Sequence, residues 1–265
     1  MSNRGRYVSI IDLALTDLRR TVRANTPSIS GVNKLANIDS AILRNAEIKK
    51  MGDAFKAGYV ANTKSILNEN VSLMSHVAIE GQLPVLRKNG IILTPKELDS
   101  IKRNFAKSYG RKFKGKTAVQ RARNIAKRTN KDVRKAIIDT RHGRKDIISK
   151  VIRNADDFGG RSLSAVRSGE VLIYSELNRA QNEMVVFLAE SIGAKYVRWV
   201  NTGRPESVCD ICKEYANSIN VTPLELPNVS DMRGIFHIDN VPEYPHSCCK
   251  CELMIIDSPY NFENA

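Results

Sequence analysis

The stretch KYVRWVNTGRPESVCDIC, residues 195–212, joins a strand pattern to a cysteine pair. Polar and apolar side chains alternate over residues 195–200, as they do in a half-buried β-strand. Cys209 and Cys212 follow, and the two residues between them allow both sulfurs to bind one tetrahedral metal ion from a tight turn. We therefore expect this stretch to begin a small metal-stabilised α+β module.

The second half of this candidate site is the sequence PHSCCKC, residues 245–251, which precedes a closing strand pattern at 252–256. His246 and Cys249 repeat the spacing of the first pair, and Cys251 lies one strand repeat beyond Cys249. Four such ligands close a structural zinc site. The expected ligands are Cys209, Cys212, His246 and Cys249, and Cys251 is able to replace either member of the second pair.

All five cysteines lie in the last quarter of the chain. An odd number of crowded cysteines fits a metal site better than a disulfide framework in a reducing cytosol. Cys248 is a further candidate ligand and His237 a weaker one, and buried cysteines or a redox pair are the alternative interpretation. Glu243 and Glu252 lie nearby in sequence, but thiolate-rich zinc sites are usually closed, and the HEXXH and HXE…PCXXC signatures are absent. We therefore expect a structural zinc ion and no enzyme activity.

A helix with a polar side precedes this module. Ser168 is its candidate cap, and the apolar stripe that follows predicts a helix to about residue 191, ending at Gly193. Glu176, Arg179 and Glu183 share one face at spacings of three and four residues. On spacing alone we expect these three side chains to form a surface ion pair opposite the apolar stripe.

The first two thirds of the chain have the apolar spacing of amphipathic helices. Apolar residues from Val8 to Val22 recur at intervals of three and four, which predicts one buried stripe. The segment 26–31 ends this helix, and further helical stretches are expected around 38–68, ending near a turn at 84–90. No apolar run approaches the roughly 18 residues of a membrane-spanning helix, and no signal-peptide cleavage pattern follows the N-terminus, so we expect a soluble protein without a membrane partner.

The next helix has a strong start signal. Thr94 suits a cap, Pro95 the first helical position, and Glu97 the position from which a carboxylate reaches back to the cap. Beyond it, apolar residues between Ala118 and Val151 predict short helices with dense cations on their outer faces. The fold class expected for the whole chain is a mainly α N-terminal region with a small α+β zinc-stapled C-terminal module. Its expected parts are a helical region at 1–93, a strongly basic helical segment at 94–160, and the zinc module at 161–265.

Charge is distributed very unevenly along the 265 residues, which carry a net charge of +14. Residues 102–153 hold 19 Lys and Arg against three acids, whereas residues 205–265 hold three against ten. A solvated helical surface would explain the basic segment, but self-repulsion at this density favours contact with nucleic acid or an acidic protein surface. Such contact would be independent of base sequence and sensitive to salt. The candidate residues are Arg111, Lys112, Lys114, Lys116, Arg121, Arg123, Lys127, Arg128, Arg134 and Lys135.

A helix with Glu-x-Asn-Arg-Ala-x-Asn, a Trp-bearing strand, CxxC and a terminal HxxCxC follow one another in this chain. Over roughly residues 155–257, this order and spacing resemble the phage head morphogenesis family, often called the Mu F-like minor head proteins. The family usually has a small residue or asparagine where this chain has Cys248, which leaves open which thiolates bind the ion. The matching residues are Glu176, Asn178, Arg179, Ala180, Asn182, Trp199, Cys209, Cys212, His246, Cys249 and Cys251.

The resemblance implies a minor virion protein that acts in head morphogenesis. It implies association with the portal, the major capsid protein or a scaffold, and a location in the virion head after assembly in the host cytoplasm. The basic segment would face packaged double-stranded DNA without sequence specificity. The main alternative is a zinc-ribbon protein that binds nucleic acid in a non-structural role, although the net charge of −7 at residues 205–265 disfavours it. A zinc hydrolase or toxin effector is a further alternative, for which the sequence lacks recognisable catalytic residues.

Overall fold

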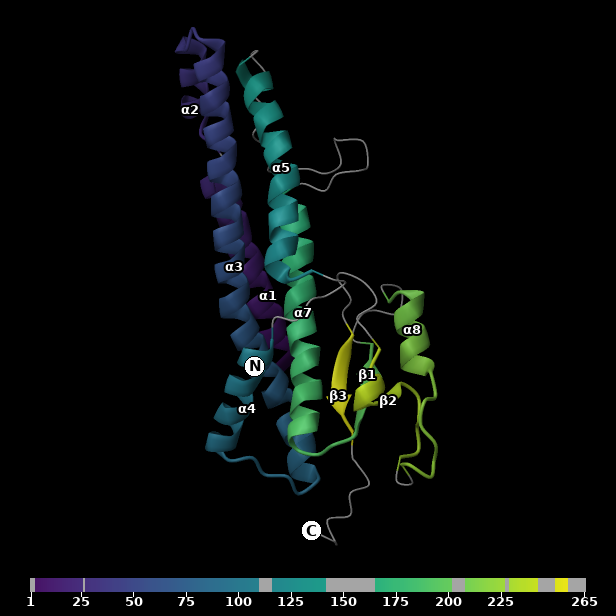
Figure 1. Cartoon of the computed structure of the whole chain (residues 1–265). Helices are drawn as coiled ribbons and strands as arrows, with labels where there is room; N and C mark the ends of the chain where they lie inside the picture. The colour runs from purple at the N-terminus through teal and green to yellow at the C-terminus, as the bar shows by residue number, and fades with distance from the viewer. Residues whose placement is uncertain are drawn as a thin grey trace. The chain divides into compact units, whose positions relative to one another are not determined.

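The chain is a mainly helical N-terminal region followed by a small three-stranded antiparallel sheet, as Figure 1 shows for the computed structural model. This confirms the fold class at that level of detail. The described residues are 3–25, 27–109, 116–141, 165–201, 208–226, 229–242 and 251–256. None of the described helices combines the length and the apolar character needed to cross a membrane.

Helices occupy most of the first 191 residues. Their bounds are α1 Asn3–Asn25, α2 Ile29–Lys34, the 3-10 helix η1 Leu35–Asn37, α3 Ala41–Lys88, α4 Pro95–Ser108, α5 Ala118–Arg141 and α7 Ala165–Ser191. Later in the chain come β1 Tyr196–Val200, α8 Asp210–Asn217, β2 Ile235–His237, the 3-10 helix η4 Ile238–Asn240 and β3 Glu252–Ile255.

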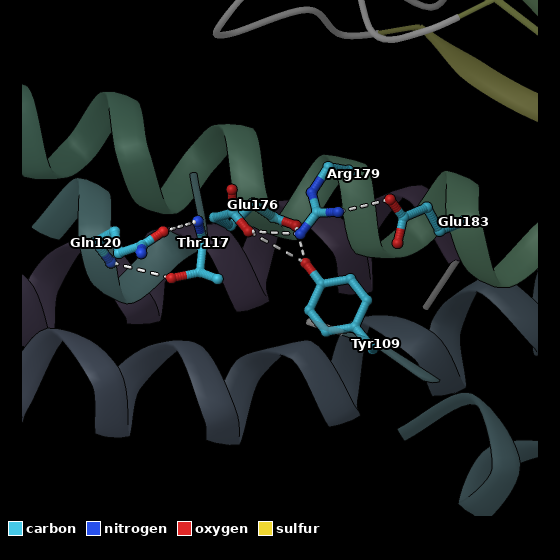
Figure 2. Close-up of polar contacts among 6 residues, drawn as sticks. All are labelled: Tyr109, Thr117, Gln120, Glu176, Arg179 and Glu183. Carbon is cyan, nitrogen blue, oxygen red and sulfur yellow. Dashed lines mark hydrogen bonds and ion pairs between the residues drawn. The ribbon is translucent and has the colours of Figure 1, made fainter. Parts of the chain in front are cut away.

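Local signals account for several helix ends. Thr94 and Glu97 form the expected capping box at α4, in which Glu97 N donates to Thr94 Oγ1 and Thr94 N donates to the Glu97 carboxylate. These hydrogen bonds lower the pKa of the Glu97 carboxyl. Thr117 and Gln120 exchange the same pair of hydrogen bonds at the start of α5 (Figure 2). Capping of this kind satisfies backbone N–H groups that have no partner within the helix.

Other helix boundaries differ from the expectation. The helical stretches expected around 38–68 belong to one 48-residue helix, α3, which passes through Pro84 and ends at Lys88. Of the short helices expected between 118 and 151, the described part, 118–141, is one 24-residue helix, α5, whose apolar residues stay in phase on one side. Residues 142–151 lie outside the described residues. Ser168 is not a cap, since α7 already begins at Ala165.

Contacts divide the chain into two compact units. One combines residues 1–10, 70–109 and 174–265, and the other combines 11–69 and 110–173. The first contains the whole sheet, whose strand order is β2-β1-β3 and whose central strand pairs through Val197 with both Phe236 and Ile255. The expected strands at 195–200 and 252–256 are therefore confirmed. The division at residues 93 and 160 stays a prediction.

The core of the first unit lies where the sheet meets helices. Met184 and Leu188 of α7, Val197 and Trp199 of β1, and Leu253 of β3 are buried in one apolar cluster. From the other side of Trp199, the ring of Tyr215 on α8 packs edge-on with centroids 5.3 Å apart. This packing fixes β1 between α7 and α8, and it buries the single tryptophan of the chain.

Gly234, just before β2, is a position where the backbone requires glycine. Its φ is +70°, and an added Cβ would lie 2.9 Å from the carbonyl oxygen of Trp199 and 3.0 Å from that of Ala216. Gly193 has a similar φ of +74° but open space around it. We expect Gly234→Ala to destabilise the first unit by about 3 kcal/mol, and Gly193→Ala by only about 1 kcal/mol, the cost of the left-handed conformation. Urea unfolding followed by Trp199 fluorescence measures both, and equal losses would show that the close contact at Gly234 relaxes at no cost.

Candidate functional site

The cysteine pair lies at the start of α8. Cys209 is the N-cap residue, and its Sγ accepts a hydrogen bond from the backbone N–H of Cys212 at 3.4 Å. Cys212 is buried and Cys209 half-buried. Two thiols one helical turn apart at a helix N-terminus have the local arrangement from which a CxxC pair binds one ion. The predicted turn is thus present as a capped helix start.

Cys251 lies at the other end of the module, directly before β3. It is 3% exposed, and its Sγ donates a hydrogen bond to Asn201 Oδ1 at 3.0 Å, at the end of β1. Cys212 and Cys251 belong to the same buried cluster, and Cys209 packs against that cluster. Three of the predicted ligands thus belong to, or pack against, one apolar cluster, although they come from segments about 40 residues apart.

The remaining predicted ligands, His246 and Cys249, lie outside the described residues, as does Cys248. Within the described part of the chain, His, Cys, Asp and Glu side chains form no group of three or more that could hold a metal ion. His237, the weaker candidate, is used locally, since its Nδ1 accepts a hydrogen bond from Asp239 N at 3.3 Å. The structure therefore shows no zinc site among the described residues, and the site stays a prediction of the sequence.

The predicted ligands have the donor atoms that zinc prefers. Thiolates are the ligands that structural zinc sites prefer, and Cys209, Cys212 and Cys251 supply sulfur donors from two segments of one core. A zinc ion bound by these residues would cross-link α8 to the chain before β3. Sulfur-rich structural sites of this type add their binding free energy to folding.

We expect the purified chain to contain one equivalent of zinc, measured by elemental mass spectrometry. Cys209→Ser and Cys249→Ser should each lose it, because each removes one of four thiolate or imidazole ligands. His237→Gln is the matched control and should keep full zinc, since the His237 ring is held by Asp239. Zinc retained in both cysteine variants, or absent from the unmodified chain, would exclude this site.

The polar side of α7 is buried, and the expected surface ion pair is wrong. Glu176 is 1% exposed and Arg179 6% exposed. The Arg179 guanidinium donates to the Glu176 carboxylate at 2.9 Å and to the Glu183 carboxylate at 2.6 Å, and it lies over the Tyr109 ring, 4.9 Å from its centroid. Figure 2 shows this group on α7, with Tyr109 reaching it from the end of α4. Helical spacing places these residues on one face, but it does not reveal that a second element covers that face.

A second set of buried polar contacts fixes the edge of the sheet. β3 pairs with β1 on one side only. On its other side, Asn182 of α7 donates to the Cys251 carbonyl at 3.1 Å and accepts from Leu253 N at 2.9 Å, and Gln82 of α3 accepts from Ile255 N at 2.9 Å. Side-chain amides thus replace a neighbouring strand at residues 251, 253 and 255. They satisfy buried backbone groups that an edge strand would otherwise leave without partners.

Sequence reasoning did not identify Gln82. The only signal is an amide within a buried helical stripe, between Ile79 and Leu86. Asn178, by contrast, belongs to the predicted motif, and it accepts a hydrogen bond from the Tyr7 hydroxyl of α1 at 2.9 Å. The motif asparagines therefore hold α7 to α1 and to β3 within the first unit.

The predicted basic residues fall into three groups. Arg111, Lys112 and Lys114 lie outside the described residues. Arg121 and Arg134 of α5 are half-buried, and Arg134 pairs with Asp53 at 3.3 Å. The exposed members are Lys116, Arg123, Lys127, Arg128 and Lys135.

No protein-family model matches this chain, and no curated protein or solved structure shows significant similarity to it.

Proposed function

We propose that this chain is a minor head protein that acts in phage head morphogenesis, associated with the portal or inner capsid and with packaged DNA. The observation that carries the proposal is the pair of hydrogen bonds between Asn182 and the Cys251–Leu253 backbone. Asn182 is the last residue of the helical motif that carries the resemblance, and Cys251 is the last residue of its cysteine motif. Residues 69 positions apart that share a family pattern are joined directly in the core.

The buried character of the helical motif supports the same proposal. Surface residues at helical spacing recur by chance, whereas Glu176, Asn178, Arg179 and Asn182 each have a structural role inside one unit. A polar group buried with its partners is costly to lose, so the fold constrains these residues. On this proposal the motif identifies the fold, and the function is inferred by analogy with other proteins of that fold.

Charge supports a role as a structural component between DNA and protein. Helix α5, in the second unit, carries five exposed cations, which are Arg123, Lys127, Arg128, Lys131 and Lys135. The zinc module is acidic, and Asp210 and Glu214 of α8 are exposed. Within this proposal, α5 faces packaged DNA and the acidic module docks on the portal, coat or scaffold protein. The zinc ion is structural and the chain is not an enzyme.

The alternative, a zinc-ribbon protein of non-structural role, predicts that the cysteine module itself contacts nucleic acid. The exposed side chains of α8 argue against this. Helix α8 carries two exposed acids, Asp210 and Glu214, and one exposed cation, Lys213. Acidic groups at that place repel phosphate.

The proposal is tested by deleting the gene from the phage or prophage that carries it and counting particles by electron microscopy. We expect few DNA-filled heads from the deletion, and normal numbers when the unmodified chain is supplied from a plasmid. The Asn62→Leu variant, which is substituted at an exposed position of α3, should restore DNA-filled heads equally well and serves as the control for a substituted protein. Normal heads without the chain would contradict the proposal.

A further inference from the structure

The exposed face of α5 carries cations at a regular interval. Arg123, Lys127, Lys131 and Lys135 are all exposed and follow one another every four residues. Four residues of an α-helix rise about 6 Å and turn about 40° beyond a full circle, so these four side chains form one gently winding row. Arg128 is exposed beside the row. We refer to these five residues as the α5 cation row.

The opposite side of α5 explains why the row points outward. Ala122, Ile125, Ala126, Val133 and Ile137 are buried and share the other face of the helix. Asp53 of α3 pairs with Arg134, which is half-buried at the margin of the row. Asp53 is thus already paired with a cation outside the row. The five members keep their charge for another partner.

We infer that the α5 cation row is a binding surface for the backbone of double-stranded DNA. The row spans about 18 Å from Arg123 to Lys135, which matches about five phosphates along one strand of B-DNA. Lysine and arginine side chains at this spacing neutralise phosphates without contacting bases. The inference names the DNA-contacting residues within the proposed function and depends on it for the identity of the DNA.

The composition of α5 favours DNA over an acidic protein surface. Protein interfaces are anchored by apolar and aromatic side chains at their centre. Asn124, which lies among the row, and Gln120, which precedes it, are polar; Ile138 beyond Lys135 is the one exposed large apolar residue described on α5, and the sequence of α5 contains no aromatic residue. The same lack of aromatic side chains disfavours single-stranded nucleic acid, whose binding sites stack bases on aromatic rings.

The test is salt-dependent binding of the full-length chain to a fluorescein-labelled 30-base-pair duplex of arbitrary sequence, followed by anisotropy from 50 to 200 mM NaCl. The row variant carries R123Q, K127Q, R128Q, K131Q and K135Q. Each neutralised phosphate contributes about 0.9 to the slope of log affinity against log salt, so the slope should become shallower by about 4.5. Over this salt range, that slope difference corresponds to about 500-fold in affinity.

The matched control removes five exposed cations elsewhere, K49Q, K56Q, K64Q, R103Q and K107Q, which lie on α3 and α4. It has the same net charge as the row variant and should keep the slope of the unmodified chain. Far-ultraviolet circular dichroism should show the same helix content in both, since glutamine is a good helix former. A third variant that exchanges Lys and Arg within the row keeps the charge and should bind as the unmodified chain does.

If the salt slope became shallower by the same amount in the row variant and in the control, the inference would be overturned, because net charge alone would then explain binding. An unchanged slope in the row variant would overturn it too. Binding of poly-glutamate, but not of duplex, through the row would assign the surface to an acidic protein instead. The proposed function is tested separately by head assembly, so a head protein that lacks row-dependent DNA binding would refute this inference alone.

Discussion

Asn182→Leu should destabilise the first unit by about 4 kcal/mol. This is the largest effect we expect from a single substitution that leaves the net charge unchanged. The Asn182 amide is 4% exposed and satisfies two buried backbone groups of β3, the Cys251 carbonyl and the Leu253 N–H. Leucine fills a similar volume but forms neither hydrogen bond. Each buried backbone group left without a partner costs about 1–3 kcal/mol.

Urea unfolding followed by the fluorescence of Trp199 measures this loss, because the single tryptophan lies in the adjacent strand β1. Hydrogen exchange of a peptide that covers 251–256 gives an independent measurement, and its protection should fall in the variant. Asn62→Leu makes the same chemical change at an exposed position of α3 and should shift stability by less than about 0.5 kcal/mol. An Asn182→Leu protein as stable as this control would show that β3 does not depend on the α7 amide.

Arg179→Met should destabilise the first unit by about 3–5 kcal/mol. It removes the cation that contacts the buried Glu176 carboxylate, which is 1% exposed. Removal of one member of a buried ion pair costs far more than the pair contributes, because a desolvated charge remains. The stacking of the guanidinium on Tyr109 is lost as well.

A double variant separates these causes. Glu176→Gln together with Arg179→Met removes both charges, and we expect it to be more stable than Arg179→Met alone by about 2 kcal/mol. Arg233→Met is the control for the loss of an arginine that contacts a carboxylate, because Arg233 and Asp231 form an exposed pair in the same unit. That control should leave the urea midpoint unchanged. If the double variant is less stable than Arg179→Met, the buried charge is not the cause of the loss.

Local sequence signals predicted the elements that depend on few residues. The capping box at Thr94, the end of α7 at Gly193 and the strand at 195–200 are confirmed because propensity, capping and alternation act over short distances. Gly193 has a φ of +74°, and Ala194 N donates to the Ala189 carbonyl across it, which closes the helix. These features require no knowledge of the tertiary structure.

The errors arise where tertiary packing decides. Spacing showed that Glu176 and Arg179 share a face, but the contact with Tyr109, 67 residues earlier in the chain, is what buries them. The role of Gln82 depends on a strand 173 residues later. Such pairings become visible only when the chain segments are brought together in space. The zinc ligand set remains partly outside the described residues and stays a prediction of the sequence.

The most direct test of the central claim is the protein composition of purified heads. The proposed function assigns the gene to a phage or prophage, whose heads would be purified by density gradient and analysed by quantitative mass spectrometry, with the portal protein as the internal reference. We expect peptides of this chain in a small copy number relative to the major coat protein, retained after washing in high salt and absent from heads made by the deletion strain. Its absence from heads of the unmodified strain would contradict its assignment as a head protein.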